Sequence, residues 1–144
     1  MANKNIYEVF DDFNKAKNKS ERIDVLRNGD SWALRQVLIG CFNPSITFSV
    51  KKLPEFKRED VPPGMSYGHM TEALSRVYLF QEGNPRVPPA LTEKRKEEIL
   101  IQILESLEPP EADVFGNMLL KNLKVKYLTE GLVNEAFAGL LPQS

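Results

Sequence analysis

The stretch that decides the fold is EKRKEEILIQILESLEPPEADVFGNMLLKNL, residues 93–123. In its first half, apolar residues three and four positions apart form one stripe, as expected for an amphipathic helix: Ile99, Ile103, Leu104 and Leu107. The pair Pro109-Pro110 ends this helix, because proline lacks a backbone donor and clashes with the preceding turn. Proline is also well suited to the first turn of a new helix. A second stripe then follows at the same spacing: Val114, Phe115, Met118 and Leu119. The stretch therefore predicts two consecutive amphipathic helices.

Helical signals recur on both sides of this stretch. We predict further helices over residues 5–17, 21–28, 32–42, 66–80 and 130–140. Suitable N-cap side chains stand before several of these segments and before the long helix: Ser20, Asp30 or Ser31, Thr92 and Thr129. Residues 45–56 differ, because Ile46, Phe48 and Val50 alternate with polar residues as in an extended segment or short strand. We therefore predict an all-α fold for residues 1–144, a single domain built as a compact bundle of about six helices with a short extended segment in the middle.

The composition is that of an ordinary globular protein. The 144 residues are 42% hydrophobic and 27% charged, with a formal net charge of -1. Cys41 is the one cysteine, so the chain can form no internal disulfide and fits a reducing cytoplasm. The first residues are polar and acidic, unlike a signal peptide. No apolar run approaches the ~20 residues that a membrane span requires. We expect no membrane association.

Few residues suggest catalysis. The single histidine, His69, cannot form a two-histidine metal site, and the sequence lacks a Cys-x-x-Cys pair and a phosphate-binding glycine loop. Ser66, His69 and Glu72 lie close in sequence, but a nucleophilic triad needs groups that converge in the fold. A polar helix start explains them better, and Cys41 is best read as a small buried hydrophobe. We expect a protein that is not an enzyme and uses no metal or other cofactor.

Three groups of basic residues are more informative. They are Lys51, Lys52, Lys57 and Arg58 around Phe56, then Arg86, Lys94, Arg95 and Lys96, and then Lys121, Lys124 and Lys126. Such side chains can bind phosphates, although each group alone can equally be a solvated surface. Cations at residues 94–96 oppose the dipole at the start of the long helix. That small cost is understandable if those charges have an anionic partner.

Taken in order, four stretches carry a resemblance to a known family: residues 6–28, 32–56, 97–125 and 128–142. The first reads IYEVFDDFNKAKNKSERIDVLRN, and the last reads LTEGLVNEAFAGLLP. Together they resemble the N-terminal, all-helical DNA-binding domain of the ATP-dependent DNA ligases of tailed bacteriophages. The Lys-x-Asp-Gly nucleophile motif of that family is absent from the sequence. The resemblance thus implies the domain's fold and binding of duplex DNA across the minor groove, but not ligation.

Two functional hypotheses follow. The first is a free-standing, non-catalytic phage accessory protein in the host cytoplasm that binds the phosphate backbone of duplex DNA. Its candidate contacts are Lys51, Lys52, Lys94, Arg95, Lys121, Lys124 and Lys126. The second is a module that kept the fold, lost DNA binding and contacts a phage or host protein of replication, transcription or the virion. Its candidate contacts are Met65, Tyr67, Phe80 and residues 85–89. Convergence of the basic groups on one face would favour DNA, and scattering among acids would favour a protein partner.

Overall fold

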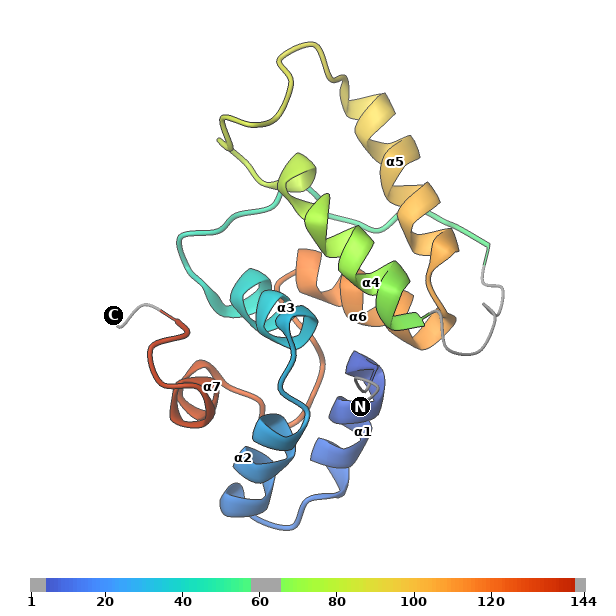
Figure 1. The fold of residues 1–144 in the computed structure, drawn as a ribbon. Coiled ribbons are helices and arrows are strands. Elements are labelled where there is room, and N and C mark those ends of the chain that lie inside the picture. Colours follow the sequence, from blue (N-terminus) through green and yellow to red (C-terminus); the bar gives the residue numbers. More distant parts are fainter. Residues whose placement is uncertain (1–4, 58–65, 142–144) are drawn as a thin grey trace.

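The computed structural model describes residues 5–57 and 66–141, and within these residues the protein is all-α, as predicted (Figure 1). The described residues form seven α-helices, against the expected six or so, and one short 3-10 helix. The helices are α1 (Ile6–Lys15), α2 (Lys19–Asn28), α3 (Trp32–Phe42), α4 (Ser66–Ser75), η1 (Val77–Phe80), α5 (Glu93–Ser106), α6 (Pro109–Leu119) and α7 (Glu130–Ala136).

Most predicted helix starts are confirmed by their capping bonds. The side chains of Ser31, Thr92 and Thr129 each accept a hydrogen bond from the backbone N–H three residues later, at 3.1 to 3.2 Å. The start of α2 is a correction, because its cap is Asn18 rather than Ser20. Asn18 Oδ1 accepts from the backbone N–H of Glu21 at 2.9 Å, and the Glu21 carboxylate accepts from the N–H of Lys17 at 2.7 Å. This reciprocal pair of bonds begins the helix before Ser20 is reached.

The helix predicted over residues 66–80 is divided in two. It breaks at Arg76, and the chain continues as η1, which leads into an extended residue at Gln81. Gln81 forms an isolated antiparallel bridge with Phe48 of the extended segment. Flanking bonds join Ser49 N–H to the Phe80 carbonyl at 2.8 Å and Glu82 N–H to the Thr47 carbonyl at 2.7 Å. The extended middle is therefore fixed to the end of η1.

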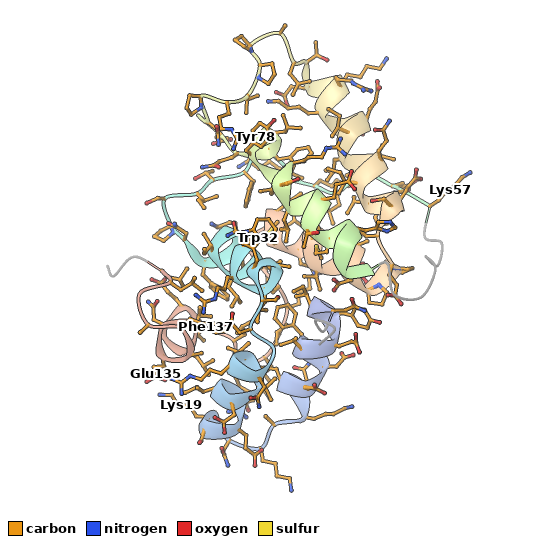
Figure 2. The ribbon with its side chains drawn as sticks, in the orientation of Figure 1. Lys19, Trp32, Lys57, Tyr78, Glu135 and Phe137 are labelled. Atoms are coloured by element: carbon orange, nitrogen blue, oxygen red, sulfur yellow. The ribbon has the colours of Figure 1, made fainter. Side chains whose placement is uncertain are left out.

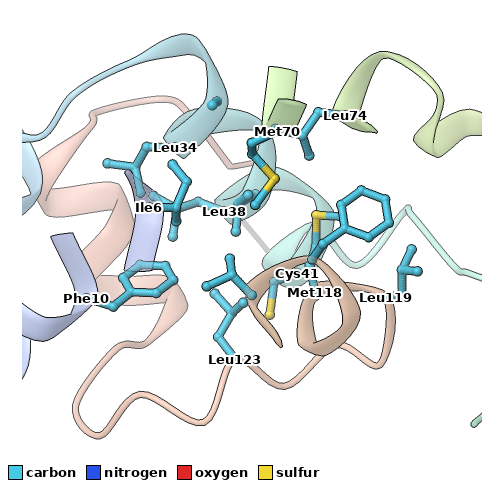
Figure 3. Packing of buried hydrophobic residues seen from close by; sticks show 14 of the residues in the cluster. Ile6, Phe10, Leu34, Leu38, Cys41, Met70, Leu74, Met118, Leu119 and Leu123 are labelled. Atoms are coloured by element: carbon cyan, nitrogen blue, oxygen red, sulfur yellow. The ribbon is translucent and has the colours of Figure 1, made fainter. Parts of the chain in front are cut away.

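Helix α6 lies at the centre of the molecule and packs against α1, α3, α4 and α5, while α2 packs against α1 and α7 (Figure 1). One cluster of buried apolar residues runs through these contacts. Figure 3 shows side chains from four helices meeting in it, among them Ile6, Leu38, Met70 and Met118. The extended segment lies directly on α6 as well, because a Cβ atom at Gly116 would be 2.6 Å from Leu53 Cδ1. The absence of that atom lets the segment bring its lysines close to α5 and α6.

Candidate nucleic-acid interface

A groove of about 550 Å³ separates the extended segment from the first turns of α5. Lysines from the first and second basic groups line it together: Lys51, Lys52 and Lys96. Three carboxylates line the same groove: Glu55, Glu93 and Glu97. The fold thus brings two basic groups to one hollow, but it mixes them with an equal number of acids.

A second, smaller groove of about 280 Å³ runs between the extended segment and the end of α6. Val50 and Lys51 line both grooves, so the two hollows adjoin. Lys121 of the third basic group lines this second groove beside apolar residues such as Phe48 and Leu119. Lys51 is therefore the residue through which all three basic groups are connected.

Lys121 has a structural role in this arrangement. Its ammonium donates three hydrogen bonds to backbone carbonyls, those of Gly40 at 3.0 Å, Asn43 at 2.8 Å and Ile46 at 2.8 Å. An ammonium group has three donors, so these bonds use its full capacity. Burial lowers the pKa of Lys121. Lys121 therefore caps the C-terminal end of α3, where a cation is favoured by the helix dipole, and has no donor left for a phosphate.

The other candidate cations divide according to whether they have an acidic partner. Arg95 Nη1 lies 3.1 Å from a Glu98 oxygen, and Lys96 Nζ lies 3.3 Å from a Glu93 oxygen. Of the seven candidate contacts, five are exposed lysines that form no ion pair in the described part of the chain: Lys51, Lys52, Lys94, Lys124 and Lys126. Charges without a carboxylate partner are the ones best able to attract a polyanion.

Lys124 and Lys126 belong to an unusual connection between α6 and α7. Three non-glycine residues in it have left-handed backbone, Lys121 at φ 61°, Lys124 at φ 59° and Tyr127 at φ 69°. Each such residue costs about 1 kcal/mol or more. The conformation leaves Lys124, Lys126 and the Tyr127 ring exposed, and the ring keeps 54% of its accessible surface. Sequence periodicity indicated a short connection here, but could not reveal this geometry.

The connection also meets a residue that the sequence patterns did not single out. The guanidinium carbon of Arg22, on α2, lies 4.0 Å from the centroid of the Tyr127 ring. Lys126 Nζ lies 5.0 Å from the same centroid. Arg22 is far from Tyr127 in sequence, so no local pattern could have joined them.

The surface suggested for a protein partner needs one correction. Phe80 is 1% exposed and belongs to the core, so it is no surface contact. Its burial follows from the bond between its carbonyl and Ser49, which fixes η1 against the extended segment. Residues 85, 88 and 89 are exposed prolines. Met65, Arg58 and the side chains of Ser66 and Tyr67 lie outside the described residues.

Two buried ionisable groups lie away from this surface. Burial raises the pKa of the Cys41 thiol. Glu111, near the start of α6, is fully buried, and its Oε1 accepts the backbone N–H of Tyr7 at 2.7 Å. Burial raises the pKa of Glu111 to about 7, partly opposed by backbone hydrogen bonds from Tyr7 and Ile6. Glu111 thus caps the N-terminal end of α1.

Neither a metal centre nor a membrane span is found in residues 5–57 and 66–141. Among them, no three His, Cys, Asp or Glu side chains gather closely enough to hold a metal ion. None of the described helices combines the length and the apolar character needed to cross a membrane.

Sequence comparison places the chain in a family. A family model described as a family of unknown function, DUF6433, matches residues 9–125, and the chain belongs to this family. No curated protein matches the sequence. The matched region includes both grooves and Lys124, but ends before Lys126 and Tyr127.

Proposed function

We propose that this protein is a non-catalytic phage accessory protein that binds duplex DNA through its sugar-phosphate backbone. The observation that carries the proposal is the position of Lys51, which lines two adjoining grooves and so connects the extended segment with the start of α5 and the end of α6. The sequence resemblance to the N-terminal DNA-binding domain of phage DNA ligases supports the same function.

The contacts divide into two sets. The first set is the pair Lys51 and Lys52 on the extended segment, with Lys94 at the start of α5. The second set is Lys124 and Lys126 on the connection between α6 and α7. All five are exposed and, among the residues described, free of ion pairs. Lysine ammonium groups act as point charges on phosphates, so binding is expected to be independent of base sequence and to weaken with salt.

Fluorescence anisotropy with intact and nicked duplexes of about 20 base pairs tests this function. Wild-type protein binds at about 50 mM salt, and log affinity falls linearly with log salt concentration. Lys51→Gln/Lys52→Gln and Lys124→Gln/Lys126→Gln each weaken binding and each reduce the salt slope by about 2, because each removes two phosphate contacts. Lys15→Gln/Lys17→Gln, on and just after α1, removes the same charge outside both grooves and is the matched control. Absence of binding at low salt would reject the proposal.

The acids of the first groove provide an independent test. Glu93→Gln/Glu97→Gln removes two negative charges from its wall. If a phosphate backbone passes along this groove, the double variant binds duplex more tightly than wild type at low salt. Weaker or unchanged binding would show that the first groove takes no part in DNA contact.

The balanced charge of the first groove also favours a second candidate, a phage or host protein as partner. Three lysines and three glutamates suit a partner that presents both signs better than they suit a polyanion. In that case the protein does not bind duplex DNA. Instead, one partner protein is captured from infected cells, and charge reversal at either Lys52 or Glu97 weakens that capture.

A further inference from the structure

A second cationic feature lies apart from the two grooves, where α2 meets the connection before α7. We call it the Arg22 cluster, consisting of Arg22, Lys126 and Tyr127. The Arg22 guanidinium carbon and Lys126 Nζ lie 4.0 and 5.0 Å from the centroid of one tyrosine ring. Each cation gains about 0.5–1 kcal/mol from the negative face of such a ring when exposed. The tyrosine thus gathers two positive charges at one point of the surface.

The cluster carries an excess of positive charge. Arg22 and Tyr127 line a pocket of about 360 Å³ whose other charged residues are Lys19 and Glu135. Those two residues neutralise each other, with Lys19 Nζ 2.7 Å from a Glu135 oxygen, and Figure 2 shows them together between α2 and α7. Within the described ranges, neither Arg22 nor Lys126 forms an ion pair. The positive charge of Arg22 therefore remains unbalanced in the pocket wall, and that of Lys126 lies on the same tyrosine ring.

This arrangement leaves the positive charge of both cations without a counter-charge among the described residues. Both cations are close enough to the ring centroid to lie within about 10 Å of each other, the Debye length at 0.1 M salt, so screening does not remove their repulsion. Tyr127 adds the cost of its left-handed backbone, φ 69°. An anion bound near both cations would be attracted by each of them.

The chemistry of the donors identifies the anion. An arginine held over a ring has little freedom left to lose, and its planar fork of N–H donors matches two oxygens of a phosphate. None of those donors bonds to another part of the described protein. Lys126, on the connection between α6 and α7, supplies a second positive charge.

We infer that the Arg22 cluster is a phosphate-binding site that holds a phosphate group of bound DNA, and that it extends the DNA interface from the grooves onto α2. The inference rests on the proposed function. It assigns a binding role to Arg22 and Tyr127, and it makes Lys126 the residue common to the cluster and to the second set of lysines.

The first experiment follows the Arg22 Nε–H signal by two-dimensional NMR of the full chain. Addition of inorganic phosphate shifts this signal saturably, and a duplex of about 20 base pairs shifts it at far lower concentration. Arg86 is the matched control, because its guanidinium carbon lies 4.3 Å from the Tyr78 ring centroid and no second cation of the described residues lies over that ring. An Arg22 signal that moves no more than that of Arg86 with either ligand would overturn the inference.

The second experiment measures duplex affinity of variants. Arg22→Gln weakens binding several-fold and reduces the salt slope by about 1, whereas Lys15→Gln, which removes one charge on α1 outside both grooves, leaves both unchanged. Arg22→Lys keeps the charge but loses the planar fork, so its affinity falls between those of wild type and Arg22→Gln and shows that folding is intact. If Lys51→Gln/Lys52→Gln weakens binding and Arg22→Gln does not, the inference is wrong while the proposed function stands. If no duplex binds but phosphate still shifts Arg22, the DNA role fails and a site for small phosphates is left.

Discussion

Lys121 and Glu111 offer an instructive comparison, because both cap the end of a helix that is distant in sequence. Glu111 belongs to α6 and caps the start of α1, whereas Lys121 follows α6 and caps the end of α3. Both charges have the sign that the helix dipole favours. Their satisfaction differs, because Lys121 has three carbonyl partners while Glu111 Oε2 is buried without a hydrogen bond.

The consequence appears in the pKa values. Desolvation lowers the pKa of Lys121, whereas its three carbonyl acceptors favour the charged ammonium. Desolvation raises the pKa of Glu111 to about 7, and the nearby carboxylates of Glu108 and Glu8 add to the shift. The two caps therefore differ in function, because Lys121 is held as a permanent charge by three acceptors while Glu111 changes its charge near neutral pH.

The largest expected effect comes from removing the permanent charge. Lys121→Met keeps the apolar stem but leaves the carbonyls of Gly40, Asn43 and Ile46 without their donor, and should destabilise the fold by about 3–5 kcal/mol. Urea unfolding followed by circular dichroism measures the loss. Lys124→Met is the control, because its exposed side chain caps no helix. Equal midpoints for the two variants would show that the Lys121 cap contributes little.

The next effect is the pH dependence caused by Glu111. Its pKa rises from 4.5 to about 7 on folding, so the folded protein binds more protons than the unfolded chain between those values. Stability should therefore fall as pH rises through this window, by roughly 3 kcal/mol for this group. Glu111→Gln abolishes that part of the slope, because the amide keeps an acceptor for Tyr7 N–H and does not titrate. Unfolding curves between pH 5 and 8 measure the difference between the two proteins.

A half-buried carboxylate near Glu111 sharpens this test. Glu108 contributes to the shift but lies at the N-cap of α6, and Glu108→Gln should lower the Glu111 pKa while keeping a pH slope. If wild type and Glu111→Gln show parallel pH profiles, Glu111 is not the group that titrates.

The smallest effect is expected where the charge is exposed. Glu135→Gln breaks the ion pair with Lys19. The side chain of Lys19 keeps 62% of its accessible surface, and that of Glu135 keeps 48%. Exposed pairs typically contribute less than about 1 kcal/mol, so the unfolding midpoint should change little. The same variant removes the acid from the pocket beside the Arg22 cluster, and duplex binding should therefore tighten. A loss of stability comparable to that of Lys121→Met would contradict the distinction between buried caps and surface charges.

The helices could be predicted because their signals are local. Stripes such as Ile6, Val9, Phe10 and Phe13 are buried as expected, and Ser31, Thr92 and Thr129 act as caps. The long-range caps could not be predicted. No feature of PPEAD distinguishes Glu111 from an exposed acid in a first turn, since its partner Tyr7 lies 104 positions earlier. Lys121 resembled Lys124 and Lys126 in sequence, but the backbone around it directs only Lys121 into the fold.

The candidate interface could likewise be predicted only in its local features. Composition identified the basic groups, and the extended segment was recognised from its alternation of apolar and polar residues. Three features could not be predicted, because they depend on how the side chains and helices are arranged in the fold. They are the joining of the groups through Lys51, the ion pairs of Arg95 and Lys96, and the contact of Arg22 with Tyr127.

The caps between distant helices also affect the order of folding. Arg27 of α2 donates to the carbonyls of Glu135 and Ala136 at the end of α7. The backbone N–H of Tyr7, on α1, donates to the Glu111 carboxylate on α6. At a translation rate of about 5–20 residues per second, the first helices are synthesised roughly 5–20 s before these partners. During that time α6 and α7, against which α1 and α2 pack in the folded protein, are not yet present to cover their apolar faces. The chain therefore reaches its final packing after synthesis of α7, and its opening helices are the part most in need of a chaperone while translation continues.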